Sequence, residues 1–270
     1  MKTIFAALLI LCVATCAAQE KFTYGPGKNQ WGNLYQAQAK NSSGNNNNAK
    51  PTPVYIWSHP NSDGKTPPSA NNIPKGMVDN CNAAGVSVIS WESVPQVKTL
   101  DDVKTCRADL DKVYEWLVAN AEKYNLDLNN LFIGGASRGT VVSWDFVCKH
   151  PEKIRGAYLT QALPQGAWAL DTENPLTPMT AKNPPVVLSY RGGIGTKDGH
   201  DPKYGQRVVD KYKELGIADR ATLLMNQKNQ YAQLIEFINK HRQAQKTLNT
   251  LKQTPAKTVI PADCVDHNRP

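Results

Sequence analysis

Residues 135–139 read Gly-Ala-Ser-Arg-Gly, a G-x-S-x-G pattern whose neighbours tightly constrain the fold. The apolar run 130–134 before it suits a buried parallel strand, and residues 140–148 after it suit a packed helix. Strand, sharp turn and helix is the context in which this pattern presents a serine above a sheet edge. Glycines tolerate such a reversal, and the helix N-terminus favours negative charge beside the serine. We therefore predict that Ser137 is a candidate nucleophile at a strand-to-helix turn; the alternative is an ordinary glycine-rich turn.

Predicted strands and helices alternate from Pro53 onward. The expected strands are 54–57, 86–91, 130–134, 154–160, 185–190 and 221–225, and the expected helices are 73–84, 100–124, 140–148, 205–215 and 231–246. Repeated β–α alternation predicts one α/β domain, a mainly parallel sheet covered by helices on both faces. We assign residues 53–252 to this domain, 19–52 to an N-terminal segment with a polar low-complexity loop, and 253–270 to a tail. Residues 164–183 suggest a crossover loop or a small cap.

The N-terminus has the features of a secretory signal. Lys2 supplies the positive charge, residues 4–13 form an apolar core too short to span a bilayer, and Cys16-Ala17-Ala18 supplies small residues before a cleavage ahead of Gln19. No later apolar run reaches membrane-spanning length. We expect a secreted or lumenal mature chain, with Asn41 of the Asn-Ser-Ser sequon as a glycosylation candidate.

Four cysteines remain after such a cleavage: Cys81, Cys106, Cys148 and Cys264. An even number in an oxidising compartment predicts two disulfides, with three possible pairings and the tail tied by Cys264. The sequence has no C-x-x-C spacing, so we expect no zinc site. Nothing in the sequence indicates a metal or another cofactor.

The formal net charge of +8 comes from scattered basic residues. No Lys/Arg run forms the stripe that nucleic-acid binding requires, so no nucleic-acid partner is expected. The charge favours solubility, or alternatively attraction to acidic polysaccharides or anionic surfaces.

The order of elements around the G-x-S-x-G pattern resembles the α/β-hydrolase superfamily, in particular secreted esterases, lipases and feruloyl esterases. The run 126–139 is similar to the approach to the nucleophile elbow in those enzymes. Residues 57–61, Trp-Ser-His-Pro-Asn, stand where the family has its His-Gly oxyanion loop. This chain has Pro60 in place of the glycine, and proline has no amide hydrogen. The resemblance therefore implies oxyanion donors at the backbone N–H groups of Asn61 and Arg138.

The resemblance also implies a position for the catalytic acid. In the family a Gly-x-x-Asp turn after a strand carries the acid, with a proline shortly after it. Residues 190–198 end a strand with such a turn, and Pro202 follows. We therefore assign Asp198 as the acid, with Asp201 in reserve; the alternative is that both carboxylates only solvate a loop.

The catalytic histidine is where the chain departs from the family. The family places it after the last strand, but residues 226–230 read Asn-Gln-Lys-Asn-Gln, and amides cannot accept the serine proton at neutral pH. The histidines of the chain are His59, His150, His200, His241 and His267. His200 lies two residues beyond Asp198, at the same sheet edge as Ser137. We choose it as the substitute base.

Two functions from different classes follow. The first is a secreted serine hydrolase that cleaves small-molecule or carbohydrate-linked carboxylic esters, with Trp57, Trp91 and Trp168 lining the substrate site. The second is a catalytically weak or inactive α/β-hydrolase-fold binding protein, which the missing histidine favours. The tryptophans have an alternative role in core or rim packing.

Overall fold

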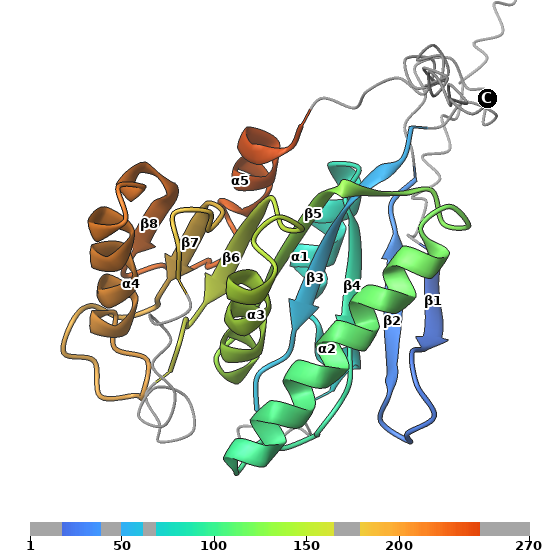
Figure 1. The fold of residues 1–270 in the computed structure, drawn as a ribbon, viewed down its shortest axis with the longest axis horizontal. Coiled ribbons are helices and arrows are strands. Elements are labelled where there is room, and N and C mark those ends of the chain that lie inside the picture. The colour runs from blue at the N-terminus through green and yellow to red at the C-terminus, as the bar shows by residue number, and fades with distance from the viewer. Residues whose placement is uncertain (1–17, 39–49, 62–68, 165–178, 244–270) are drawn as a thin grey trace, which may run out of the picture.

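We describe a computed structural model of the chain at residues 18–38, 50–61, 69–164 and 179–243. Its centre is an eight-stranded sheet in the order β1-β2-β4-β3-β5-β6-β7-β8 (Figure 1). The strands are β1 (Ala18–Thr23), β2 (Trp31–Gln36), β3 (Thr52–Ser58), β4 (Ser87–Trp91), β5 (Leu126–Ala136), β6 (Gly156–Thr160), β7 (Val186–Ser189) and β8 (Ala221–Leu224).

The sheet is parallel from β4 to β8, which confirms the predicted α/β architecture. The sequence analysis missed β1 and β2. They pair antiparallel with each other, and β2 pairs antiparallel with β4. Apart from Ala18, the last residue of the predicted signal, their hairpin lies inside the predicted N-terminal segment, so the sheet begins well before Pro53. Both strands carry several polar residues, which hid them from a search for apolar runs.

Helices cover both faces of the sheet. One face packs against α2 (Leu100–Asn120), α3 (Arg138–Lys149) and α4 (Lys203–Glu214), which lie in front in Figure 1. The other face packs against α1 (Lys75–Ala83) and α5 (Leu234–His241). The start of α2 has a capping box, in which the Thr99 side chain accepts from the backbone of Asp102 and the Asp102 side chain accepts from the backbone of Thr99.

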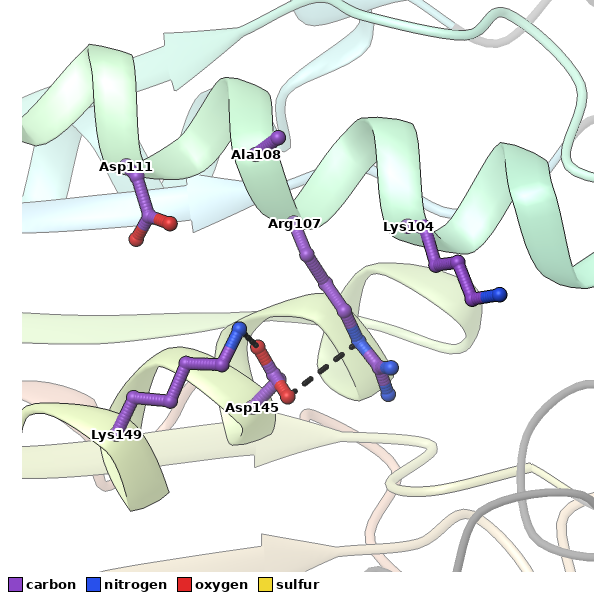
Figure 2. Close-up of a pocket in the computed structure, with 6 residues that line it drawn as sticks. All are labelled: Lys104, Arg107, Ala108, Asp111, Asp145 and Lys149. Atoms are coloured by element: carbon purple, nitrogen blue, oxygen red, sulfur yellow. Dashed lines mark ion pairs between the residues drawn. The ribbon is translucent and has the colours of Figure 1, made fainter.

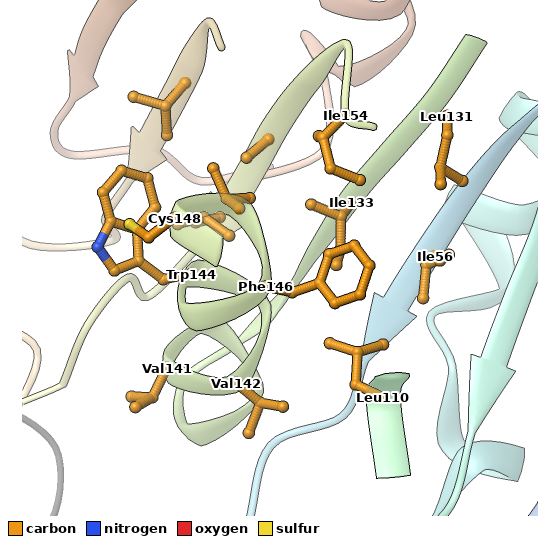
Figure 3. Packing of buried hydrophobic residues seen from close by; sticks show 14 of the residues in the cluster. Ile56, Leu110, Leu131, Ile133, Val141, Val142, Trp144, Phe146, Cys148 and Ile154 are labelled. Atoms are coloured by element: carbon orange, nitrogen blue, oxygen red, sulfur yellow. The ribbon is translucent and has the colours of Figure 1, made fainter. Parts of the chain in front are cut away.

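Strand side chains alternate between the two faces, as a period of two requires. Val54 and Ile56 of β3 join the core under α2, α3 and α4, whereas Tyr55 and Trp57 join the core under α1 and α5. Figure 3 shows the first core, where Phe146 of α3 lies over Ile133 of β5. The central strands are therefore buried on both sides, which makes them rigid supports for the loops at their ends.

The cysteine prediction is wrong. Two disulfides among four cysteines would need at least one bond among Cys81, Cys106 and Cys148, and these three are free and buried. They lie on three separate helices, α1, α2 and α3. Burial raises the pKa of the Cys81 and Cys148 thiols to about 12. Cys264 lies outside the described residues.

None of the helices in the described part of the chain is long and apolar enough to cross a bilayer. No group of three or more His, Cys, Asp or Glu side chains there could hold a metal ion.

Candidate active site

The site lies at the point where successive strands stop being added on one side of β3 and start being added on its other side. The chain runs from β3 outward to β4 and then returns past β3 to form β5, so β3 and β5 are neighbours with helices leaving to opposite sides. Ser58 at the end of β3 pairs with Gly135 near the end of β5. Ligands of open α/β sheets bind at such switch points, outside the carboxyl ends of the strands.

Ser137 stands between the last residue of β5 and the first residue of α3. Its backbone has φ 50° and ψ −122°, a conformation that non-glycine residues rarely adopt. The flanking glycines permit this turn, because a Cβ on Gly135 or Gly139 would collide with the Ser58 carbonyl oxygen. The turn thus brings the end of β3 and the start of α3 into backbone contact beneath Ser137.

The structure brings Ser137 and His200 together. Ser137 Oγ lies 2.9 Å from His200 Nε2, within hydrogen-bond distance. On the other side of the ring, His200 Nδ1 lies 3.7 Å from Asp198 Oδ1, an ion-pair distance beyond that of a hydrogen bond. Asp198 Oδ1 also accepts a hydrogen bond of 2.9 Å from the His200 backbone N–H. The order serine, imidazole, carboxylate is the one that base-assisted nucleophilic attack requires.

The environment of His200 favours a neutral imidazole. Burial lowers its pKa below the ordinary value of 6.5; Asp198 opposes this shift and Arg191 adds to it. A neutral ring at pH 7 has one nitrogen free to accept a proton, as a general base must.

Asp201, the reserve acid, has a different task. Its side chain is buried and accepts backbone hydrogen bonds from Gly195 at 3.1 Å and Lys203 at 2.9 Å. These bonds fasten the loop after β7 to the start of α4. Asp201 thereby fixes the segment that carries Asp198 and His200.

The remaining described histidines lie in other surroundings. His150 follows the last residue of α3, packs against Phe146 and lies 3.6 Å from Asp111. His241 ends α5 and packs against Phe237, and burial lowers its pKa. His267 lies outside the described residues.

The predicted oxyanion loop lies directly on the elbow. Its His59 is buried and donates from Nε2 to Glu92 Oε1 at 3.0 Å. The His59 ring also contacts Arg138 Nη2 at 3.1 Å. The side chain of Asn61 pairs in both directions with the backbone of Val97, at 2.9 and 3.0 Å. Sequence reasoning missed Glu92, whose only signal was a carboxylate placed directly after a strand.

An amide cluster occupies the place after β8 where the family has its histidine. Gln230 is buried and donates to the Ser189 carbonyl at 3.0 Å and to Gln161 Oε1 at 3.2 Å. Gln161 Oε1 also accepts from the Arg191 backbone at 2.7 Å, and Arg191 Nε donates to Gln230 Oε1 at 3.1 Å. These bonds join the ends of β6, β7 and β8. The sequence analysis treated this loop only as lacking a base.

The structure corrects the assignment of Trp57 and Trp91 to the substrate site. Both are buried in the core, where Trp57 Nε1 donates to Tyr231 Oη and Trp91 Nε1 donates to Ser58 Oγ, each at 3.1 Å. Sequence places them at strand ends but does not reveal that helices cover them. Trp168 lies outside the described residues.

A separate hollow lies between α2 and α3 (Figure 2), and its lining includes none of the proposed site residues. Its volume is about 380 Å³. Asp145 occupies its floor and is paired with Lys149 at 2.9 Å and Arg107 at 3.6 Å. The Asp145 carboxylate is therefore already paired with two of the cations that line this hollow.

No protein-family model and no curated protein matches the sequence. Many solved structures do match the fold. Esterase 2 of Thermogutta terrifontis, phosphonylated by sarin, is similar with a TM-score of 0.62 at 13% identity, over 83% of this chain and 94% of that one. A lipase/esterase of Lactobacillus plantarum gives 0.59 at 14% identity, over 77% and 89%. Fluorophosphonate-binding serine hydrolase F of Staphylococcus aureus gives 0.58 at 11% identity, over 83% and 98%. With these matches and its strand order, the chain has the α/β-hydrolase fold.

Proposed function

We propose that this protein is a serine hydrolase of carboxylic esters, with Ser137 as nucleophile, His200 as base and Asp198 as the acid that orients His200. The observation that carries the proposal is the 2.9 Å contact between Ser137 Oγ and His200 Nε2 at a strained strand-to-helix turn. A nucleophile within hydrogen-bond reach of a base, with a third group beyond it, is the signature of covalent catalysis.

The reaction follows from this geometry. Ser137 Oγ attacks the ester carbonyl carbon while His200 Nε2 takes the hydroxyl proton, and a tetrahedral oxyanion forms. The backbone N–H groups of Arg138 and Asn61 are the proposed donors to that oxyanion. When the tetrahedral species collapses, the C–O bond to the alcohol breaks and His200 returns its proton to the alcohol. Water then repeats both steps on the acyl-serine, releasing the acid and restoring Ser137.

The structural neighbours support this reaction class. One is an esterase phosphonylated by sarin, another is a fluorophosphonate-binding serine hydrolase, and a third is a carbohydrate esterase from gut microbiota at 11% identity. Their sequence identities are low, so the contact between Ser137 and His200 supports the reaction class more strongly than the likeness does.

Ester turnover by purified variants tests the proposal. We expect the wild-type chain to hydrolyse p-nitrophenyl acetate and Ser137→Ala to lose that activity. The matched control is His150→Gln, because His150 lies at the opposite end of α3, about 20 Å from Ser137 along the helix axis. Wild-type turnover equal to that of Ser137→Ala would overturn the proposal.

One observation favours the alternative of a non-catalytic binding protein. Asp198 is 52% exposed and its carboxylate lies 3.7 Å from His200 Nδ1, so the third group holds the imidazole loosely. A chain that has lost activity but kept the fold would show no turnover and still bind ester-like ligands. The turnover experiment separates the two functions.

We also propose that the mature chain is secreted or lumenal and acts on small-molecule or carbohydrate-linked esters. Cleavage ahead of Gln19 would leave all but the first residue of β1 in the sheet. N-terminal sequencing of protein recovered from the medium of expressing cells tests the cleavage, and Gln19 is the expected first residue.

A further inference from the structure

We infer that the side chain of Arg138, acting through His59 and Glu92, is a positioning device for the oxyanion hole. The inference rests on the proposed function and deepens it. It assigns tasks to three buried polar side chains that the reaction itself does not use.

The three side chains form a continuous chain beneath Ser137. Arg138, His59 and Glu92 are 3%, 4% and 4% exposed. Arg138 Nη2 lies 3.1 Å from His59 Nδ1, and His59 Nε2 lies 3.0 Å from Glu92 Oε1. Arg138 Nη1 also contacts the buried Cys106 Sγ at 3.1 Å. Burying a cation and an anion is costly unless each has partners, so this chain of contacts holds its members in fixed places.

The three side chains are held by contacts on every side. The Glu92 carboxylate only accepts, so His59 donates to it from Nε2. His59 Nδ1 lies 2.9 Å from the Pro60 carbonyl oxygen, and Arg138 Nη2 lies 3.1 and 3.5 Å from the two ring nitrogens, so the guanidinium contacts the imidazole ring as a whole. Glu92 also accepts from the backbone N–H groups of Ser93 at 3.1 Å and Ala70 at 3.3 Å. The far end of the chain is thus anchored to the backbone after β4.

This chain links the two proposed oxyanion donors. One donor is the backbone N–H of Arg138, and the other belongs to Asn61, two residues after His59. The Arg138 side chain therefore holds the loop that carries the second donor. Gly139 lets the backbone of Ser58 and His59 rest directly on α3, and the Asn61 side chain secures the end of the loop on Val97.

The link matters because the oxyanion donors must be held in position before negative charge develops on the substrate oxygen. Donors are effective at about 2.7–3.1 Å from the oxyanion, so a displaced loop would weaken the transition state more than it weakens substrate binding. Removing the Arg138 side chain leaves its own backbone N–H in place. The expected loss therefore comes through Asn61.

The test compares Arg138→Leu with the charge-balanced pair Arg138→Leu/Glu92→Gln, which avoids leaving Glu92 buried without its cation. Arg138→Lys, which keeps one donor and the charge, is the conservative rescue. We expect kcat for p-nitrophenyl acetate to fall about 30-fold in the pair, with KM unchanged within about twofold. The Ki of a trifluoromethyl ketone, which mimics the tetrahedral species, should rise by the same factor, and Arg138→Lys should recover part of both losses.

The outcomes separate this inference from the proposed function. An active wild type together with a folded double variant that keeps its kcat and its Ki would overturn the inference alone. A lower kcat, a higher KM and a lower thermal stability without a matching rise in Ki would also overturn it, because that pattern indicates that the fold as a whole is disturbed. A wild type with no turnover above Ser137→Ala would overturn the proposed function, and the inference with it.

Discussion

Two histidine–carboxylate pairs lie next to the nucleophile turn, His59–Glu92 and His200–Asp198, and they differ in burial, separation and partners. The His59–Glu92 pair is buried, its atoms lie 3.0 Å apart, and backbone amides hold its carboxylate. In the His200–Asp198 pair the side chains are 22% and 52% exposed and the atoms lie 3.7 Å apart. The buried pair contacts an arginine, whereas the exposed pair contacts the hydroxyl of Ser137.

This difference fits two different roles, a structural role for His59–Glu92 and a catalytic role for His200. Burial makes a broken interaction costly, so the His59–Glu92 pair fixes backbone positions. A general base must instead gain and lose a proton in each turnover, which requires access to the substrate and a pKa near or below neutrality. Burial lowers the pKa of His200, whereas the hydrogen bonds from His59 and backbone amides outweigh burial and lower the pKa of Glu92. The lowered pKa of His200 keeps its imidazole neutral and able to accept a proton, whereas the lowered pKa of Glu92 keeps its carboxylate ionised.

The largest expected effect comes from removing His200. His200→Ala should lower kcat/KM for p-nitrophenyl acetate by about 10³-fold, about 4 kcal/mol, because Ser137 and His200 act as a unit. Adding His200→Ala to Ser137→Ala should then cost little more. The control His150→Gln should stay within about twofold of wild type. Near-normal turnover by His200→Ala would assign the base to another group.

Breaking the buried pair should act on stability. Glu92→Ala leaves the Arg138 cation buried without its carboxylate and should lower the free energy of unfolding by about 3 kcal/mol, measured by urea denaturation. Glu92→Gln should cost less, since its amide oxygen can still accept from His59. If Glu92→Ala unfolds at the wild-type urea midpoint, the buried pair does not hold the fold.

A smaller effect is expected from the exposed carboxylate. Asp198→Asn should lower kcat/KM about tenfold, far less than a fully buried triad acid would, because water already solvates half of its side chain. Asp210→Asn, on the outer side of α4, is the matched control. A loss as large as that of His200→Ala would show that Asp198 couples to the imidazole more tightly than their separation indicates.

The smallest expected effects are on the pH dependence of kcat/KM. His200 must be neutral to accept a proton, and its pKa lies below 6.5, so kcat/KM should fall only below pH 6.5. Asp198 raises this pKa and Arg191 lowers it. The midpoint of the acid limb should therefore move to lower pH in Asp198→Asn and to higher pH in Arg191→Gln, and the upward shift should fade in high salt. Equal shifts in one direction would contradict these assignments.

The sequence was informative where local patterns determine structure. The glycines around Ser137 and the apolar run before it predicted the turn, because a Cβ at Gly135 or Gly139 would collide with the Ser58 carbonyl oxygen. The β–α alternation likewise predicted the parallel sheet. The choice of His200 rested on its nearness to Asp198 in the chain, and the structure places its ring nitrogen beside Ser137 Oγ.

The sequence was uninformative where distant segments meet. Glu92, His59 and Arg138 come from three separate loops or helix starts, and no spacing rule relates them. The fates of Trp57 and Trp91 depended on which helices cover the strand ends. The cysteine count suggested disulfides, but pairing requires close Cβ atoms, and the three described cysteines lie on different helices.

The central claim is that Ser137 is a nucleophile activated by His200. Its most direct test is the rate of modification by a fluorophosphonate, followed by peptide mapping of the adduct in wild type, His200→Ala and His150→Gln. We predict a single adduct on Ser137 in wild type and His150→Gln, and a rate about 10³-fold lower in His200→Ala. An adduct on another residue, or equal rates in wild type and His200→Ala, would contradict the claim.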